Sequence, residues 1–145
     1  AVPDWLMSAT LRLIRFMYLI DTDVLIWAIR GRWEIVGLLE KLAGRSATFI
    51  SAVSIAEIYQ NIFPSEITTT DDLLYHHVIL PVNDLVAKQG GLYWQQFSPR
   101  LKNLSLVDCL IAATAKLERL DVLTLNSRHF TMTDIHITKP LDSKI

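Results

Sequence analysis

The sequence is poor in cysteine, glycine and proline, with one, five and five of these residues in a chain of 145. The single thiol, Cys109, excludes an intrachain disulfide and a zinc knuckle, so a reducing cytoplasm is the expected compartment. So few glycines and prolines exclude collagen-like and linker-like chains and favour long regular elements. No apolar run reaches the roughly 18 residues of a membrane helix, because Asp21, Asp23 and Arg30 interrupt the most apolar region.

A strong excess of either charge is also missing. The 14 basic and 15 acidic residues give a formal net charge of −1, so no general basic surface exists to hold nucleic acid. Hydrophobic types make up 51% of the residues and charged types 20%, which is enough apolar material for one compact domain. Any contact with nucleic acid must therefore be local or mediated by a metal ion.

We expect the folded domain to span residues 17–145 and to follow an N-terminal extension, residues 1–16. The extension has Arg12 and Arg15 inside its apolar part, which makes a poor secretory signal. Met7 and Met17 are both candidate native starts, so the extension need not belong to the native protein.

Short apolar runs alternate with helical patterns along the chain. Five runs are predicted strands, at residues 17–20, 47–50, 78–80, 122–125 and 135–137. Helices are predicted between them, over residues 24–30, 33–43, 51–59, 83–97 and 105–119. Crossover helices imply a mostly parallel sheet of four or five strands with helices on both faces, a three-layer α/β/α fold.

Several polar residues stand where a helix should begin. Ser51 and the Ser105-x-x-Asp108 pair are predicted to accept or exchange hydrogen bonds with free backbone N–H groups, and either Asn83 or Asp84 is predicted to cap the helix that ends near residue 97. Thr70, followed by two aspartates, is predicted to cap a further short helix.

Acidic residues gather near the predicted carboxyl ends of strands, where open α/β sheets place their reactive crevice. Asp21 follows the first strand, Glu57 lies on the helix after the second, and Asp108 begins the helix before the fourth. Three carboxylates within about 6 Å would repel by roughly 3 kcal/mol per pair at an effective dielectric of about 20. Mg²⁺ or Mn²⁺ would relieve that repulsion, which favours metal-dependent phosphoryl chemistry.

Each of these residues also has an ordinary structural explanation. Asp21 and Asp23 are good helix caps, and Asp108 is well placed to complement a helix dipole. Glu57 alone is most simply a solvated helix residue, and Asn126 is a common turn residue.

Four segments in order give a more specific signal: residues 18–27 (YLIDTDVLIW), 50–59 (ISAVSIAEIY), 106–115 (LVDCLIAATA) and 123–130 (LTLNSRHF). Together they resemble the PIN-domain ribonucleases, especially VapC-type toxins of type II toxin–antitoxin systems. The resemblance spans about residues 17–141. It implies a parallel sheet between helices, in agreement with the pattern above.

The resemblance also implies roles for individual residues. Asp21, Glu57 and Asp108 fall on the family's metal-binding positions. Asp23 falls on a polar position whose side chain is expected to orient Asp21 or a metal-bound water. Thr124, which flanks Asn126, is expected to be a second supporting polar residue. Asn126 falls near a fourth position that is acidic in many members, so a second tightly held metal is in doubt here. We expect Arg128, Arg100 and Lys102 to meet RNA phosphates.

The function implied is hydrolysis of RNA phosphodiesters by an endoribonuclease that uses Mg²⁺ or Mn²⁺ and leaves 3′-hydroxyl and 5′-phosphate ends. Its expected partners are a VapB-like antitoxin that covers the acidic crevice and a second copy of the chain in a homodimer.

Two alternatives stay open. Asp21-Thr-Asp23 resembles the start of haloacid-dehalogenase-type phosphatases, although Leu25 stands where that motif has a hydroxyl residue. The second alternative is a PIN-like binding module without catalytic activity, which stays open because Asn126 stands where many family members have an acidic residue.

Overall fold

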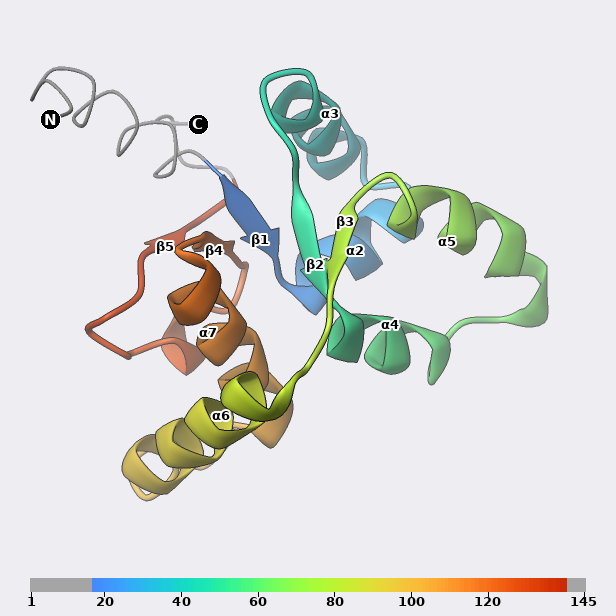
Figure 1. Cartoon of the computed structure of the whole chain (residues 1–145). Coiled ribbons are helices and arrows are strands. Elements are labelled where there is room, and N and C mark those ends of the chain that lie inside the picture. The colour runs from blue at the N-terminus through green and yellow to red at the C-terminus, as the bar shows by residue number, and fades with distance from the viewer. Residues whose placement is uncertain (1–16, 141–145) are drawn as a thin grey trace, which may run out of the picture.

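The computed structural model describes residues 17–140, in which five short strands form one sheet. The strands are β1 (Tyr18–Ile20), β2 (Phe49–Ser51), β3 (Val78–Leu80), β4 (Asp121–Leu123) and β5 (Ile137–Thr138). Their order is β3-β2-β1-β4-β5, and every neighbouring pair is parallel (Figure 1). The predicted parallel sheet is confirmed, with five strands.

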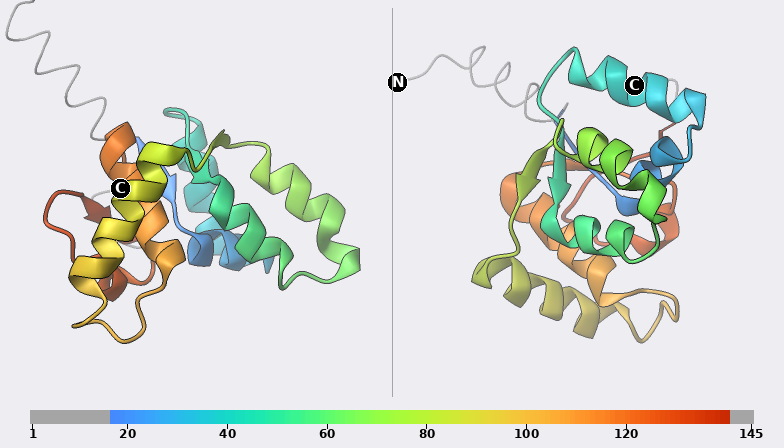
Figure 2. Two further views of the ribbon diagram at one scale, coloured as in Figure 1. Left: turned by 60° about the horizontal axis from the view of Figure 1, so that its bottom comes forward. Right: turned by 90° about the vertical axis from the view of Figure 1, so that its right-hand side faces the viewer.

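Helices connect the strands and cover both faces of the sheet. Within the described range they are α2 (Thr22–Ile29), α3 (Trp33–Ala43), α4 (Ala52–Tyr59), α5 (Ile67–Leu74), α6 (Asp84–Phe97) and α7 (Leu106–Glu118). Figures 1 and 2 show α6 and α7 together on one side of the sheet, with α3 and α5 on the other. The three-layer α/β/α architecture is therefore confirmed.

Two buried clusters hold these layers together, one on each face. Leu19 and Val122 pack with α6 and α7, whereas Ile20 and Leu123 pack with α2, α3, α4 and α5. Successive strand residues thus enter opposite cores, as the period of two in a β-strand requires. Because helices cover both faces, β1 and β3 contain apolar residues only, and β2 and β4 are apolar at two of their three positions, which is why the strands appear as short apolar runs in the sequence.

Most helix boundaries follow the predicted caps. Ser51 accepts a hydrogen bond from the Val53 N–H at 3.2 Å, and Asn83 accepts one from the Val86 N–H at 2.9 Å. Gly31, just after α2, has a φ of 80°, a conformation that glycine adopts without strain. Thr70 is different: it lies inside α5 and is fully buried, so the prediction that it caps a helix is wrong. The helix instead continues from the short 3-10 helix Pro64–Glu66.

The N-terminal extension, residues 1–16, lies outside the described residues. Between residues 17 and 140, no helix combines the length and the apolar character needed to cross a membrane.

Parallel order brings the carboxyl ends of all five strands to one edge of the sheet. Asp21 follows β1, Ser51 ends β2, and Thr124 follows β4. Figure 1 shows α2 and α4 leaving directly from the ends of their strands. This edge is where the topology places the candidate site.

Helices α6 and α7 cross at Gly90. A Cβ atom added there would lie 2.6 Å from Leu110 Cδ2 and 3.3 Å from Leu110 Cα, so the crossing requires a residue without a side chain. The neighbouring Gly91 is exposed, and a Cβ atom added to it would meet nothing within 4 Å.

This contrast gives a paired prediction for stability. We expect Gly90→Ala to lower the free energy of unfolding by about 1–3 kcal/mol, because overpacking forces the two helices apart. Gly91→Ala is expected to raise it by about 0.5–1 kcal/mol, since alanine restricts the unfolded chain and favours the helix. Urea unfolding of both variants measures the difference. Equal effects at the two positions would contradict the close crossing.

Candidate active site at the carboxyl edge of the sheet

Asp21 forms the centre of the site. It is 5% exposed and caps α2, with Oδ1 accepting a hydrogen bond from the Thr22 N–H at 2.8 Å. Its other oxygen, Oδ2, accepts a hydrogen bond from Thr124 Oγ1 at 2.7 Å. Asp21 therefore both caps a helix and lies at the centre of the site. Its hydrogen bond with Thr124 connects the ends of the neighbouring strands β1 and β4.

Glu57 reaches the same edge from α4. Thr22 Oγ1 lies 2.6 Å from Glu57 Oε1 and 2.9 Å from Ser54 Oγ. Thr22 and Ser54 were not recognised as site residues from the sequence. The available signal was the position of Thr22 between two aspartates, together with the three-residue spacing of Ser54 and Glu57, which puts both on one helix face.

Asp108 lies in the first turn of α7 and also belongs to a capping box. Its Oδ2 accepts a hydrogen bond from the Ser105 N–H at 3.1 Å, and Ser105 Oγ accepts one from the Asp108 N–H at 3.0 Å. The same Oδ2 is 3.2 Å from His129 Nδ1. His129 is a contact that the sequence did not reveal, because residues 108 and 129 meet only after folding.

Asp23 comes from the first turn of α2. The backbone N–H of Leu125, just after β4, donates to Asp23 Oδ1 at 3.5 Å. Asp23 Oδ2 is buried and has no hydrogen-bond partner. An unpartnered, buried carboxylate oxygen is costly unless something else compensates its charge.

The four carboxylates influence one another. Burial raises the pKa of Asp21 well above its usual value, and the charges of Asp23 and Asp108 raise it further, against hydrogen bonds from Thr124 and Thr22. Burial also raises the pKa of Asp23, against a hydrogen bond with the Asp21 side chain and hydrogen bonds from the Leu125 and Val24 N–H groups, and the charge of Asp108 adds to the rise.

Glu57 belongs to the same electrostatic group. Burial raises its pKa, the hydrogen bond from Thr22 lowers it, and the charges of Asp108 and Asp23 raise it. The carboxylates of α2, α4 and α7 are therefore close enough to repel, as the sequence argument required.

The donor set fits a hard divalent cation in its chemistry, because every candidate ligand is a carboxylate oxygen. Across residues 17–140, no three His, Cys, Asp or Glu side chains stand as a group ready to hold a metal ion. Thr22, Thr124 and the Ser105 N–H engage carboxylate oxygens instead. The support for a cation is therefore the chemistry of the carboxylate set and its mutual repulsion.

The remaining predicted residues lie around this group. Asn126 is exposed, and its backbone N–H donates to Thr124 Oγ1 at 2.9 Å. Arg128 is exposed in the short 3-10 helix Ser127–His129, next to the His129 contact with Asp108. Arg100 and Lys102 are exposed in the segment between α6 and α7, which leads to Ser105.

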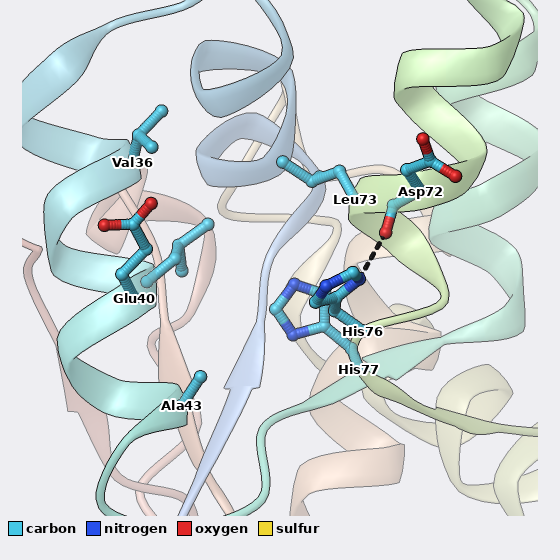
Figure 3. A pocket seen from close by; sticks show the side chains of 8 residues that line it. Val36, Glu40, Ala43, Asp72, Leu73, His76 and His77 are labelled. Carbon is cyan, nitrogen blue, oxygen red and sulfur yellow. Dashed lines mark hydrogen bonds between the residues drawn. The ribbon is translucent and has the colours of Figure 1, made fainter.

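A cavity of about 250 Å³ lies elsewhere, between α3 and α5 (Figure 3). Val36, Leu39 and Leu73 give it apolar walls, and His76 and His77 close one side. His77 directly precedes β3, so the cavity is near the amino ends of the strands, opposite the carboxylates. It is therefore separate from the candidate active site.

Comparison with known proteins defines the class. The family model of the PIN domain matches residues 18–135, and the chain belongs to the PIN domain family. Among curated proteins it is similar to Ribonuclease VapC10 of Mycobacterium tuberculosis, with 32% identity over 116 residues that cover 80% of this chain and 87% of that protein. Ribonuclease VapC19 of the same organism is 29% identical over 117 residues, 80% of this chain and 94% of its own.

Solved structures agree with this assignment. A toxin–antitoxin complex from Klebsiella pneumoniae contains a chain with a TM-score of 0.68 and 26% identity, over 86% of this chain and 98% of that one. DNA-bound VapBC from Salmonella typhimurium has a TM-score of 0.73 at 21% identity, with the same coverage of each chain. At 21% identity, the similarity to the Salmonella protein shows a shared fold. The predicted resemblance to PIN-domain proteins is thus confirmed.

The raised pKa of Asp23 predicts how the stability of the metal-free protein, kept in a solution with a chelator, depends on pH. Asp23 binds protons more tightly folded than unfolded, so its contribution to stability is lost as pH rises above its ordinary value of 3.8. We expect Asp23→Asn to raise the free energy of unfolding by about 1 kcal/mol at about pH 7. That gain should shrink as pH falls toward the ordinary value, because Asp23 is then protonated in both states.

Urea unfolding across this pH range provides the measurement, with Asp72→Asn, an exposed carboxylate on α5, as the matched control. The comparison cancels His77, whose pKa burial lowers to about 4 and whose effect on stability has the opposite sign. If Asp23→Asn is less stable than wild type near neutral pH, the neighbouring carboxylates do not destabilise the charged form of Asp23.

Proposed function

We propose that the protein is a metal-dependent endoribonuclease that hydrolyses RNA phosphodiesters, and that it is the toxin of a toxin–antitoxin pair in the cytoplasm. The observation that carries this proposal is the meeting of Asp21, Asp23, Glu57 and Asp108 at one edge of a PIN fold. Curated relatives at 32% and 29% identity are named as ribonucleases, which supports the reaction class.

Asp21, Glu57 and Asp108 are the residues that would hold Mg²⁺ or Mn²⁺, ions that prefer a few carboxylate oxygens. A bound divalent cation lowers the pKa of water and stabilises negative charge on phosphoryl oxygens. The chain itself has to keep its three carboxylates in place against their repulsion, and Thr22 and Thr124 do so by donating hydrogen bonds to Glu57 and Asp21.

RNA would meet the site from the exposed side. Asn126 offers an uncharged amide that can donate to or accept from RNA, and we assign it a catalytic position at the substrate. Arg128, Arg100 and Lys102 are exposed cations on segments adjoining Asp108, suited to phosphate oxygens. With a net charge of −1, these local groups would supply most of the electrostatic attraction for RNA.

The partners proposed are a VapB-like antitoxin and a second copy of the chain. A solved relative at 26% identity is a toxin–antitoxin complex. The described surface also carries large apolar side chains, with Trp33 77% exposed, Tyr75 70% and Phe63 60%. Exposed aromatic residues of this kind are typical of protein interfaces.

The two alternatives are weaker. The family match is to the PIN domain, and it gives no support to a haloacid-dehalogenase-type phosphatase that would use Asp21 as a nucleophile. A non-catalytic module would have little reason to bury Asp21 beside other carboxylates at a cost to stability.

Cleavage of RNA tests the reaction. The purified chain, separated from any partner, should cleave RNA with Mg²⁺ or Mn²⁺ and stop when a chelator is added. Asp21→Asn and Asp108→Asn should each reduce the rate by at least about 100-fold, since even disturbing a residue that supports a metal ligand costs 10–100-fold. A gel assay on a defined single-stranded RNA measures the rate.

Glu118→Gln is the matched control, because Glu118 lies on α7 with Asp108 but at the opposite end of the helix. Circular dichroism should show that all three variants are folded. If both aspartate variants cleave RNA at the wild-type rate, the proposed function is wrong.

Toxicity tests the biological role. Induced expression should arrest the growth of a bacterial host, and Asp21→Asn should relieve the arrest, because a toxin of this kind acts by cutting RNA. Colony counts after induction measure the effect, with equal protein levels checked by immunoblotting. If the host keeps growing while it contains folded wild-type enzyme that cleaves RNA, the toxin assignment is wrong and the nuclease assignment stands.

A further inference from the structure

Ser54 is a polar residue on the buried side of α4. It is fully buried and lies one helical turn before Glu57. The helix and the core alone would favour alanine at this position, because serine forms helices less readily and a buried hydroxyl is costly unless it is hydrogen-bonded. The Ser54 hydroxyl therefore needs an explanation outside α4. Its contact is with Thr22 on α2, where the two hydroxyl oxygens are 2.9 Å apart.

Thr22 has two hydrogen-bonded neighbours and only one hydroxyl proton. Its Oγ1 lies 2.6 Å from Glu57 Oε1 and 2.9 Å from Ser54 Oγ. An ionised carboxylate can only accept a hydrogen bond, so the proton of Thr22 goes to Glu57. The hydrogen bond between the two hydroxyls is then donated by Ser54. Counting protons thus gives the direction of the whole chain, from Ser54 to Thr22 and from Thr22 to Glu57.

The same arrangement occurs at Asp21, where the first donor is a backbone N–H. The N–H of Asn126 donates to Thr124 Oγ1 at 2.9 Å, and Thr124 Oγ1 donates to Asp21 Oδ2 at 2.7 Å. A threonine hydroxyl that already accepts one hydrogen bond has its proton turned toward the carboxylate, and hydrogen bonds in such a chain strengthen one another. Two carboxylates of the site are therefore each bound by a threonine whose own oxygen is held by a third group.

We propose that Ser54 is a positioning residue of the nuclease site, which directs the Thr22 hydroxyl toward Glu57 and so fixes the orientation of the Glu57 carboxylate. The inference rests on the proposed ribonuclease function. Ser54 is fully buried and Thr22 is 6% exposed, so neither side chain is placed to bind RNA itself. The effect of Ser54 on the reaction passes through Thr22.

Steady-state cleavage of a defined single-stranded RNA, at one fixed Mg²⁺ concentration, tests this role. Ser54→Ala should lower kcat about tenfold and leave KM within about twofold of wild type, because residues that orient a metal ligand typically contribute 10–100-fold. Thr70→Val is the matched control and should cleave RNA like wild type. It removes a hydroxyl that is equally buried, on α5, and has no hydrogen-bond partner.

Three results of this assay would overturn the proposal. They are a wild-type kcat for folded Ser54→Ala, a loss that appears in KM alone, and an equal loss of kcat in Thr70→Val.

Substitutions of Thr22 separate positioning from packing. Thr22→Val removes the hydroxyl with little change of shape and should lower kcat at least as much as Ser54→Ala. Thr22→Ser keeps the hydroxyl and should restore most of the activity. In the double variant Ser54→Ala/Thr22→Val, the change at Ser54 should have no further effect, because the hydroxyl through which it acts is already absent. Losses that multiply in the double variant, or a folded Thr22→Ser as impaired as Thr22→Val, would contradict the proposal.

Nuclear magnetic resonance of the metal-free chain tests the hydrogen-bond direction without any reaction. In wild type, the Thr22 hydroxyl proton should be protected from exchange with water and show a nuclear Overhauser effect to the side chain of Glu57. In Ser54→Ala this proton should exchange faster, because its oxygen is no longer held. A Thr22 proton directed at Ser54, or an exchange rate that Ser54→Ala leaves unchanged, would show that the assigned direction is wrong.

These measurements distinguish failure of the positioning role from failure of the proposed function. If wild type cleaves RNA and folded Ser54→Ala cleaves it equally well, the positioning role is wrong and the proposed function stands. If wild type shows the Thr22 proton directed at Glu57 but cleaves no RNA with Mg²⁺ or Mn²⁺, the proposed function is wrong although the hydrogen-bond direction is right.

Discussion

Repulsion among carboxylates taken out of water is the constraint around which this site is built. Burial alone raises the pKa of Asp21, and the charges of Asp23 and Asp108 raise it further. Hydrogen bonds from threonine hydroxyls lower the pKa values again: Thr22 donates to Glu57, and Thr124 donates to Asp21. These hydrogen bonds connect α2, α4 and the end of β4, so the polar network of the site also joins separate parts of the fold. Holding these buried carboxylates together lowers the stability of the fold, and such a cost is typical of functional sites.

Helix capping and the proposed function use the same residues. Asp21 caps α2 and Asp108 belongs to the capping box of α7. The ordinary explanation of each residue is therefore correct, and it does not compete with the functional one. A parallel strand that ends in a helix needs a polar residue at the junction, and the same junction faces the crevice. The fold thus obtains a helix start and a candidate ligand from a single side chain.

Prediction from the sequence was most successful where local patterns decide the structure. The range of α3 and the caps Ser51 and Ser105 were correct, and of the two candidate caps for α6 the structure has Asn83. It failed at Thr70, which is buried within α5, because a threonine before two aspartates has the same local pattern whether it caps a helix or packs inside one. Thr22 and His129 were missed as partners of Glu57 and Asp108 because each contact joins residues far apart in the chain.

The sequence by itself determined the alternation of strands and helices, the apolar cores on both faces of the sheet, and the acidic residue types at the strand ends. These follow from periodicity and capping, which act over a few neighbouring residues. Only the tertiary structure decided which oxygens have partners. The Leu125 N–H reaches Asp23 Oδ1, and the Thr124 hydroxyl reaches Asp21 Oδ2, because β4 lies beside β1 and brings a segment far along the chain to the end of β1. Packing of distant segments sets such contacts, and no local pattern encodes them.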